Sequence, residues 1–232
     1  MLPISPGVRH AVSARIVLAA VVALGCKGVP AWEKGKKFFH YALRGKPSTL
    51  EPVRTSTRFS GEAQAPLYET LFDYKYLVRP LEIEPLLAAK MPEVSDDSLT
   101  YTITLKQGVL FHDDPCFPGS VGREMVAQDV VYSILRMADI KLAPEGWWIY
   151  QDRIAGLDAF QRRMNARKDG EPFDWDAVVP GIKALDRYRV RLELVRPFPQ
   201  LLYVLAMQYA SVVPRECAEY YAPEFGNHAV GT

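Results

Sequence analysis

Two stretches of the chain alternate between apolar and polar residues, and this pattern restricts the fold more than any other feature. In residues 99–105 four apolar side chains face one way and three threonines the other, and residues 187–194 alternate charged with apolar side chains. A period of two predicts strands of an antiparallel sheet with one buried face. Turn-forming residues precede the first stretch, so we expect Val94 and the residues before it to pair antiparallel with it.

Apolar spacing and chain-breaking residues predict the other elements. Residues 127–139 are the clearest amphipathic helix, because Val130, Ile134 and Leu135 share one face. Residues 45–61 are rich in Pro, Ser, Thr and Gly and are predicted as a loop. Further helices are predicted at 63–74, 158–168, 176–185 and 201–207, and further strands at 38–43, 109–111 and 210–213.

Charge and composition limit the partners. The chain has 232 residues and a net charge of +1, so nothing in it suits a polyanion, and nucleic acid is not expected as a partner. Apolar residues make up 49% of the chain, which is enough for a folded core. The length allows one domain or two.

The first residues indicate export. Two arginines precede an uninterrupted apolar run at 16–24, which Gly25 and Cys26 follow. This arrangement predicts a secretory signal over residues 1–26, since the run is shorter than the ~20 apolar residues of a membrane span. Residues 27–37 are polar and are predicted to be a tether.

The end of the signal resembles a bacterial lipobox, in which the cysteine is acylated. Cys26 is the predicted lipidation site, although Ala23 stands where lipoboxes usually have Leu. Two acyl chains would hold the protein at a membrane surface. The alternative is an ordinary cleaved signal followed by a chance cysteine, which would leave the protein free in the periplasm.

Export also affects the other two cysteines. In an oxidising compartment Cys116 and Cys217 are a possible disulfide, although their separation in the sequence does not decide whether they meet. Neither has another cysteine or a histidine at the spacing that a zinc site needs, so no metal site is expected.

The segment His112-Asp113-Asp114 is the one cluster that suggests an enzyme, because an imidazole beside two carboxylates can transfer protons. No nucleophile motif accompanies it. We therefore predict a turn whose carboxylates accept local backbone hydrogen bonds, and we expect neither catalytic residues nor a cofactor.

Seven motifs follow one another along the chain. They are Leu-Glu-Pro at 50–52, Leu-Tyr-Glu-Thr-Leu at 67–71, Tyr-Thr-Ile-Thr-Leu-Lys-Gln-Gly-Val-Leu-Phe-His-Asp at 101–113, Ala-Gln-Asp-Val-Val-Tyr-Ser at 127–133, Ile-Ala-Gly-Leu-Asp at 154–158, Val-Pro-Arg-Glu at 213–216 and Val-Gly-Thr at 230–232. In this order they resemble the extracellular solute-binding proteins of family 5, which bind oligopeptides and dipeptides for ABC importers.

The resemblance implies a multi-lobed α/β fold similar to type II periplasmic binding proteins, which closes on its ligand like a hinged clamp. Residues 38–71 would start the first lobe, residues 72–215 would form a small inserted lobe with a mostly antiparallel sheet, and residues 216–232 would return to the first lobe. The third lobe would lie beyond Thr232 and be absent from this chain.

The chain departs from the family at two places. Val126 stands where the family often has a helix-capping Thr, and Val cannot accept that hydrogen bond. Residues 113–119 form a longer turn than is common in the family.

The resemblance also implies a function. The protein would be the substrate-binding component of an ABC importer, capturing a peptide or a similar small solute in the periplasm or cell envelope. It would then deliver this ligand to the permease and ATPase subunits. The alternative is a ligand-sensing lipoprotein of the same fold that signals to a membrane partner.

The residues predicted to bind the ligand lie in two places. Residues 57–62 match the part of the family where ligand backbone pairs with protein backbone as in a β-sheet, and Trp148 matches an aromatic residue facing the peptide. The alternatives are a solvated surface loop and a core aromatic. The predicted ligand contacts are Arg58, Phe59, Ser60, Gly61, Glu62 and Trp148.

Overall fold

The computed structural model describes residues 35, 37, 42–55, 57–168 and 170–232. The predicted signal segment, the lipidation of Cys26, most of the tether and most of the strand at 38–43 lie outside the described residues. Residues 43–232 form one compact unit. Within the described part of the chain, none of the helices has the length and apolar character that crossing a membrane requires.

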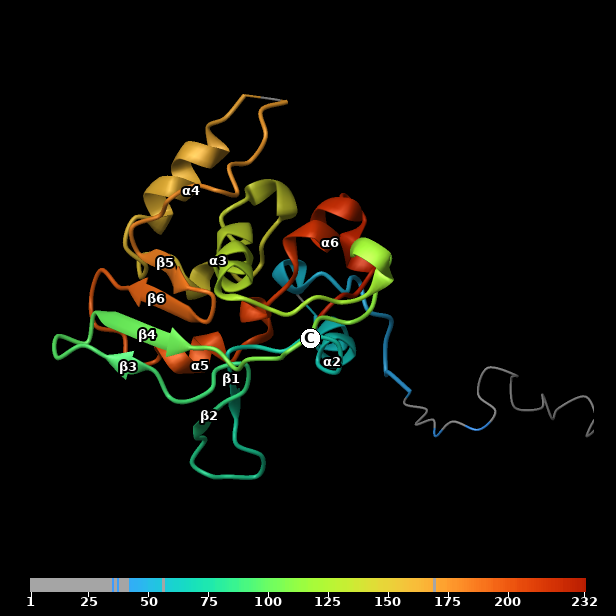
Figure 1. Ribbon diagram of the computed structural model, residues 1–232, viewed down its shortest axis with the longest axis horizontal. Coiled ribbons are helices and arrows are strands. Elements are labelled where there is room, and N and C mark those ends of the chain that lie inside the picture. Colours follow the sequence, from blue (N-terminus) through green and yellow to red (C-terminus); the bar gives the residue numbers. More distant parts are fainter. Residues whose placement is uncertain (1–34, 36, 38–41, 56, 169) are drawn as a thin grey trace, which may run out of the picture. The chain divides into compact units, whose positions relative to one another are not determined.

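The main sheet has four antiparallel strands in the order β3–β4–β6–β5 (Figure 1). Along β4 the side chains of Tyr101 and Ile103 are buried, and along β6 those of Val190 and Leu192 are buried. The alternating patterns therefore predicted both strands correctly, and the antiparallel partner at Val94 is confirmed as well. The strands are β3 (Glu93–Val94), β4 (Thr100–Thr104), β5 (Ile182–Asp186) and β6 (Arg189–Glu193).

One amphipathic helix covers this sheet. Helix α3 (Ala127–Arg136) lies against β5 and β6 and confirms the strongest helix prediction, ending three residues before the predicted boundary. As expected, the side chain of Val126 provides no cap. The carboxylate of Asp129 instead accepts a hydrogen bond from the Val126 backbone N–H at 2.8 Å, which satisfies one of the free donors at the helix start.

The remaining helices are short. Two of them confirm predictions. Helix α4 begins one residue before the predicted helix at 158–168 and otherwise lies inside it, and α5 lies inside the predicted helix at 201–207. The α-helices are α2 (Arg58–Gln64), α4 (Leu157–Asn165), α5 (Leu201–Leu205) and α6 (Arg215–Tyr220). Single 3-10 turns are η2 (Pro52–Arg54), η3 (Pro118–Ser120), η4 (Ile140–Leu142), η5 (Trp147–Ile149), η6 (Gln208–Ala210) and η7 (Phe225–Asn227).

Four predictions of helix, loop or strand were wrong, because capping and strand pairing override local composition and spacing. The loop predicted up to residue 61 and the helix predicted at 63–74 are replaced by α2, which Thr57 caps and which ends before Pro66. The helix predicted at 176–185 is replaced in part by β5, which pairs with β6. The strand predicted at 210–213 is absent, since η6 occupies its start.

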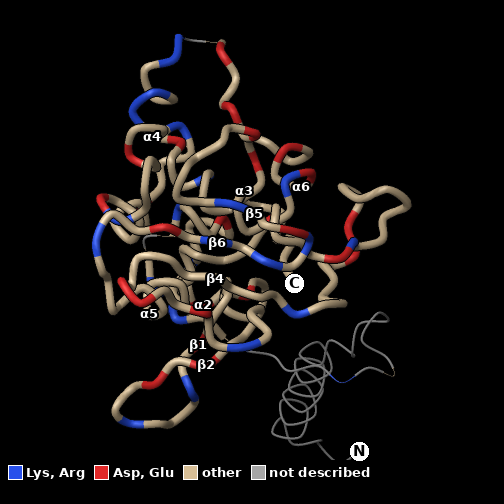
Figure 2. The backbone as a smooth tube through the Cα atoms, turned by 60° about the vertical axis from the view of Figure 1, so that its left-hand side comes forward, with Lys and Arg blue, Asp and Glu red and all other residues tan. Residues whose placement is uncertain are grey.

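A second, two-stranded sheet projects from the rest of residues 43–232 (Figures 1 and 2). Strand β1 (Phe72–Tyr74) pairs antiparallel with β2 (Ile83–Pro85). The ring of Tyr74 packs on that of Tyr203 in α5, with ring centres 6.1 Å apart. This contact holds the end of β1 against α5.

A buried ion pair links the first loop to the end of α3. The Arg136 guanidinium donates two hydrogen bonds of 2.8 Å to the two carboxylate oxygens of Glu51, and each side chain is only 4% exposed. Glu51 also accepts a hydrogen bond from the backbone N–H of Val53 and so caps η2. The Leu-Glu-Pro motif of the sequence is thus held to the sheet-covering helix.

Replacing Glu51 by Gln should lower the free energy of unfolding by about 3–5 kcal/mol, because the Arg136 guanidinium stays buried after losing its counter-charge. Urea unfolding followed by circular dichroism measures this loss. Glu93→Gln is the matched control: it removes an exposed pair with Lys90 at 2.7 Å and should leave stability unchanged. A loss at Glu51 no larger than that of the control would contradict a structural role for the buried pair.

Candidate ligand-binding hollow

Helix α2 brings part of the predicted ligand segment to one hollow. The side-chain oxygen of Thr57 accepts a hydrogen bond from the Ser60 N–H at 3.2 Å and starts the helix. One turn along, Arg58 and Glu62 form an ion pair of 2.6 Å across the outer face of the helix. Arg58, Gly61 and Glu62 therefore share one face.

This face borders a hollow of about 490 Å³. Its opposite wall is η6, and the two walls lie so close that a Cβ atom at Gly61 would come within 2.6 Å of the Gln208 side-chain oxygen. The absence of a side chain at Gly61 keeps this space open. The lining residues are Thr55, Thr57, Arg58, Gly61, Glu62, Ala65, Gln208 and Tyr209.

A second hollow of about 380 Å³ continues the first, since both are lined by Ala65 and Gln208. It adds the carboxylates of Glu69 and Asp73 and the hydroxyl-bearing Thr70 and Ser211. No basic side chain lines this second part among the described residues. The combined hollow therefore has charges of both signs at α2, where Arg58 and Glu62 lie, and only negative charges near β1, where Glu69 and Asp73 lie.

The other predicted ligand residues lie elsewhere. Ser60 is fully buried and its hydroxyl accepts a hydrogen bond from the Ser48 N–H at 3.0 Å. The Phe59 ring packs against Gly45, where an added Cβ would come within 2.6 Å of it. Trp148 is 49% exposed and lines neither hollow. The structure therefore brings three of the six predicted residues to the hollow.

The predicted mode of backbone pairing is corrected by the helical conformation of α2. Pairing as in a β-sheet needs an extended backbone with free N–H and C=O groups, whereas the Gly61 N–H already donates to the Thr57 carbonyl at 3.1 Å. Gln208 and Tyr209 were missed by the sequence reasoning. They are far from α2 in sequence, and no local pattern marks them as part of the hollow.

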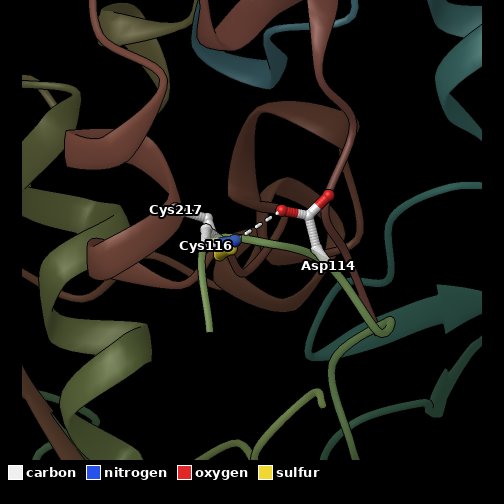
Figure 3. A group of neighbouring side chains, drawn as sticks. All are labelled: Asp114, Cys116 and Cys217. Carbon is white, nitrogen blue, oxygen red and sulfur yellow. Dashed lines mark hydrogen bonds between the residues drawn. A yellow bond between two sulfur atoms is a disulfide. The ribbon is translucent and has the colours of Figure 1, made fainter. Parts of the chain in front are cut away.

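The predicted turn at residues 112–114 lines neither hollow, and its last residue, Asp114, lies beside Cys116 and Cys217 (Figure 3). The Asp114 carboxylate accepts hydrogen bonds from the Cys116 N–H at 2.9 Å and from the Tyr221 hydroxyl at 2.8 Å. The Asp113 carboxylate accepts one from the Gly122 N–H at 2.9 Å. Both carboxylates thus accept backbone hydrogen bonds, as the turn prediction required. The hydrogen bond to Asp114 raises the pKa of Tyr221 to about 12.

The structure joins Cys116 and Cys217 by a disulfide, with Cα atoms 4.9 Å apart. Asp114 lies beside the two sulfur atoms, a grouping that could hold a metal ion if the thiols were free. Bonded to each other, the sulfur atoms have no thiolate to offer a metal. The disulfide instead attaches the segment at 113–119 to α6.

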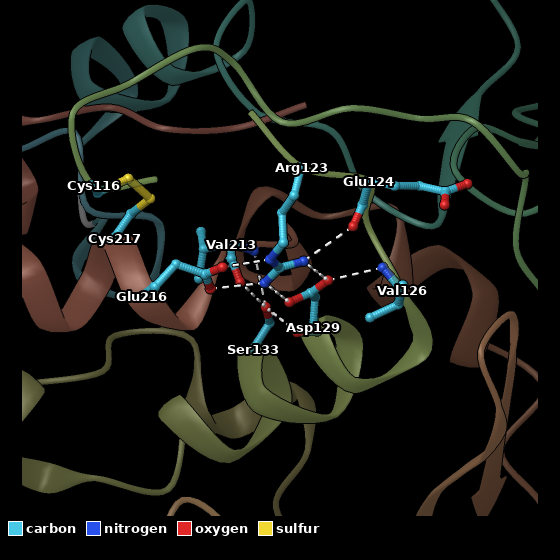
Figure 4. Close-up of polar contacts among 9 residues, drawn as sticks. All are labelled: Cys116, Arg123, Glu124, Val126, Asp129, Ser133, Val213, Glu216 and Cys217. Carbon is cyan, nitrogen blue, oxygen red and sulfur yellow. Dashed lines mark hydrogen bonds and ion pairs between the residues drawn. A yellow bond between two sulfur atoms is a disulfide. The ribbon is translucent and has the colours of Figure 1, made fainter. Parts of the chain in front are cut away.

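Next to the disulfide, Arg123 connects three segments (Figure 4). Its guanidinium donates to both carboxylate oxygens of Asp129, at 2.8 and 2.7 Å, and to Glu216 at 2.7 Å. The hydroxyl of Ser133 accepts a hydrogen bond from the Val213 N–H at 2.9 Å. Motif residues at 127–133 and 213–216 are therefore bonded to one another and stabilise the frame.

A family model matches residues 82–232 of the chain, that of bacterial extracellular solute-binding proteins, family 5, middle part. The chain belongs to this family. The predicted resemblance is confirmed, and so is the fold class, an α/β arrangement with antiparallel sheets of the type II periplasmic-binding-protein kind, for the part of that fold that the chain covers.

Among curated relatives, this family 5 chain is 30% identical to the dipeptide-binding protein of Escherichia coli (strain K12) over 180 residues, which covers 77% of this chain and 30% of that protein. It is 31% identical to di/tripeptide-binding protein 2 of Pseudomonas aeruginosa (strain UCBPP-PA14) over 178 residues, covering 74% and 29%. The chain therefore spans less than a third of the length of these relatives.

Solved structures agree on the fold. The periplasmic binding protein DppA from Helicobacter pylori, in complex with the peptide STSA, has a TM-score of 0.58 and 26% identity, covering 80% of this chain and 33% of that one. The pheromone receptor PrgZ has a TM-score of 0.63 at 20% identity, covering 80% and 33%, and shows the fold alone. The division of the chain into lobes stays a prediction.

Changing Cys116 to Ser should lower the free energy of unfolding by about 4–5 kcal/mol, because the cross-link closes a loop of 101 residues and restricts the unfolded chain. Urea unfolding with and without dithiothreitol measures the effect. Reductant should bring the unsubstituted protein down to the stability of the variant and leave a Cys116→Ser, Cys217→Ser double variant unchanged. Equal stability of the oxidised and reduced protein would rule out the bond.

Proposed function

We propose that this chain forms part of the substrate-binding component of an ABC importer, which captures peptides or a similar small solute outside the cytoplasmic membrane. Family membership and the dipeptide-binding relatives support this role. The observation that carries it is the hollow between α2 and η6, where Arg58, Gly61 and Glu62 face Gln208 and Tyr209. Charged, amide and aromatic groups around an open space suit a polar, flexible ligand.

In this proposal the hollow is one wall of the binding site. It is open on its outer side, and the chain spans less than a third of its relatives' length, so the opposite wall would come from the rest of the full-length protein. A hinge motion would bring the two walls together, and the closed walls would bury and hold the ligand. Trp148 stays a predicted ligand contact. Its side chain is exposed, and closure of the two walls would be able to cover it.

Side chains rather than backbone would select the ligand at this wall. The Arg58–Glu62 pair lies at the surface, so exchanging it for bonds to a ligand's carboxylate and amine costs little. The Tyr209 ring offers apolar area with a polar end. The acidic end at Glu69 and Asp73 favours a positively charged group of the ligand.

In this proposal the protein binds its ligand without changing it, which the binding role in the names of its relatives supports. Delivery would be to a permease driven by ATPase subunits, in the periplasm or cell envelope. Lipidation of Cys26 as an anchor belongs to this proposal as a prediction from the sequence. One relative is named a dipeptide-binding protein and another, of Haemophilus influenzae, a peptide transport periplasmic protein, and no observation on the described residues favours the signalling alternative.

Replacing Gly61 by Val in the full-length protein should weaken peptide binding about tenfold or more, because the new side chain enters the space between α2 and Gln208. Isothermal titration with a library of di- and tripeptides measures the affinity. Ala63→Val is the matched control on the same helix, at a position that lines neither hollow, and should bind as the unsubstituted protein does.

Two results would count against this proposal in different ways. If the unsubstituted protein gives no heat with any peptide, peptides are not the ligand. If Gly61→Val and Ala63→Val both bind with full affinity, peptides are the ligand but the hollow beside α2 is not their site. Circular dichroism of both variants verifies that they fold.

A further inference from the structure

The hairpin between β1 and β2 ends in an apolar tip, which we define as residues 75–81. Tyr76 is 85% exposed, Leu77 74% and Leu81 48%. Folded proteins rarely display large apolar side chains together on a projecting element unless the element has a partner. The tip lies at the far end of the hairpin, beyond the strands that join it to the body (Figures 1 and 2).

The hairpin is held in place by several contacts. The Tyr203 hydroxyl in α5 donates to the Leu81 carbonyl at 3.3 Å, and the Tyr74 hydroxyl donates to the Tyr203 carbonyl at 3.2 Å. Across the hairpin the Lys75 N–H donates to the Glu82 carbonyl at 2.9 Å. The apolar side chains are therefore presented outward on a supported element.

Charge is divided along the hairpin. The tip contains Lys75 and Arg79 and no acidic residue, whereas Asp73 and Glu84 lie on the strands and Glu82 stands opposite Lys75 where the strands meet the tip. Lys75 pairs with Glu82 at 2.6 Å. Arg79 is exposed, donates to the Val78 carbonyl at 2.7 Å, and forms no ion pair with any carboxylate of the described residues. Arg79, two residues from Leu77 and two from Leu81, is thus free to bind an anion.

We propose that the hairpin tip inserts into the surface of a membrane that contains anionic lipids. Tyrosine and leucine suit the boundary between headgroups and acyl chains, and arginine can reach from there to lipid phosphates. The combination of three exposed large apolar side chains with a cation that pairs with no described carboxylate matches an anionic lipid surface, which offers both apolar chains and phosphates. Membrane insertion of the tip goes beyond the proposed function and does not depend on lipidation of Cys26. The inserted tip would orient the protein with the hairpin toward the membrane.

Tryptophan placed at the tip tests the proposal, because bromine atoms on lipid chains quench only tryptophan that contacts them. Tyr76→Trp in the full chain should lose fluorescence on mixing with vesicles of brominated phosphatidylcholine and phosphatidylglycerol. Val178→Trp is the matched control, at a position 92% exposed on the segment between α4 and β5. It should show no quenching beyond that of the unsubstituted protein, whose native tryptophans set the baseline.

The result is unambiguous in either direction. Quenching at position 76 above that at position 178 supports insertion, even if the N-terminal segment itself binds vesicles, because the readout is local. Equal quenching at the two positions overturns the proposal and leaves a protein partner as the occupant of the tip. Circular dichroism shows whether both variants keep the fold.

Charge at the tip is tested in the Tyr76→Trp protein. Adding Arg79→Gln should weaken binding of the tip to the anionic vesicles about fivefold, the factor that one basic residue near an anionic surface contributes. Adding Arg163→Gln, which changes an arginine of α4, should have no effect on quenching at position 76. Unchanged quenching in Arg79→Gln, or equal quenching with purely zwitterionic vesicles, would overturn the anionic requirement.

Discussion

The buried ion pair between Glu51 and Arg136 is the contact on which the arrangement of the hollow depends. It holds the first loop against the last turn of α3, and the Phe225 ring lies 5.2 Å from the same guanidinium. Segments from the beginning, middle and end of the described chain therefore meet at one cation. Because η2 packs beside η6 and α2 is the next helix after η2, this pair holds in place the segment from which both walls of the hollow are positioned.

The sequence predicted those parts of the fold whose signal is local. Alternation around Tyr101 and Val190 marks two strands, because each faces both the core and water. The identity of β5 depends instead on its pairing with β6, and the helical spacing of α2 is hidden because Ser60 and Gly61 on it are buried small residues rather than apolar ones. The α2 side of the hollow was predicted from the family resemblance, whereas Gln208 lies far away in the sequence and no motif marks it.

The motifs that identify the family are mostly part of its frame. Asp129 and Ser133 bind other protein groups, and Gly231 lies so close to the Leu67 carbonyl that no side chain fits there. Residues with such tight packing report the fold reliably, because few alternatives satisfy the same contacts. They carry little information about the ligand, which is decided at exposed positions such as Arg58.

The outer strands of the main sheet have a consequence for the behaviour of the chain at high concentration. One edge, β3, spans only Glu93–Val94, and the other, β5, is interrupted by an irregularity between Ala184 and Asp186 and carries the charged Lys183. Short, bent and charged edges are poor templates for adding a strand from another molecule. Sheet-to-sheet aggregation is therefore disfavoured, and many copies can be held close together without joining into fibres.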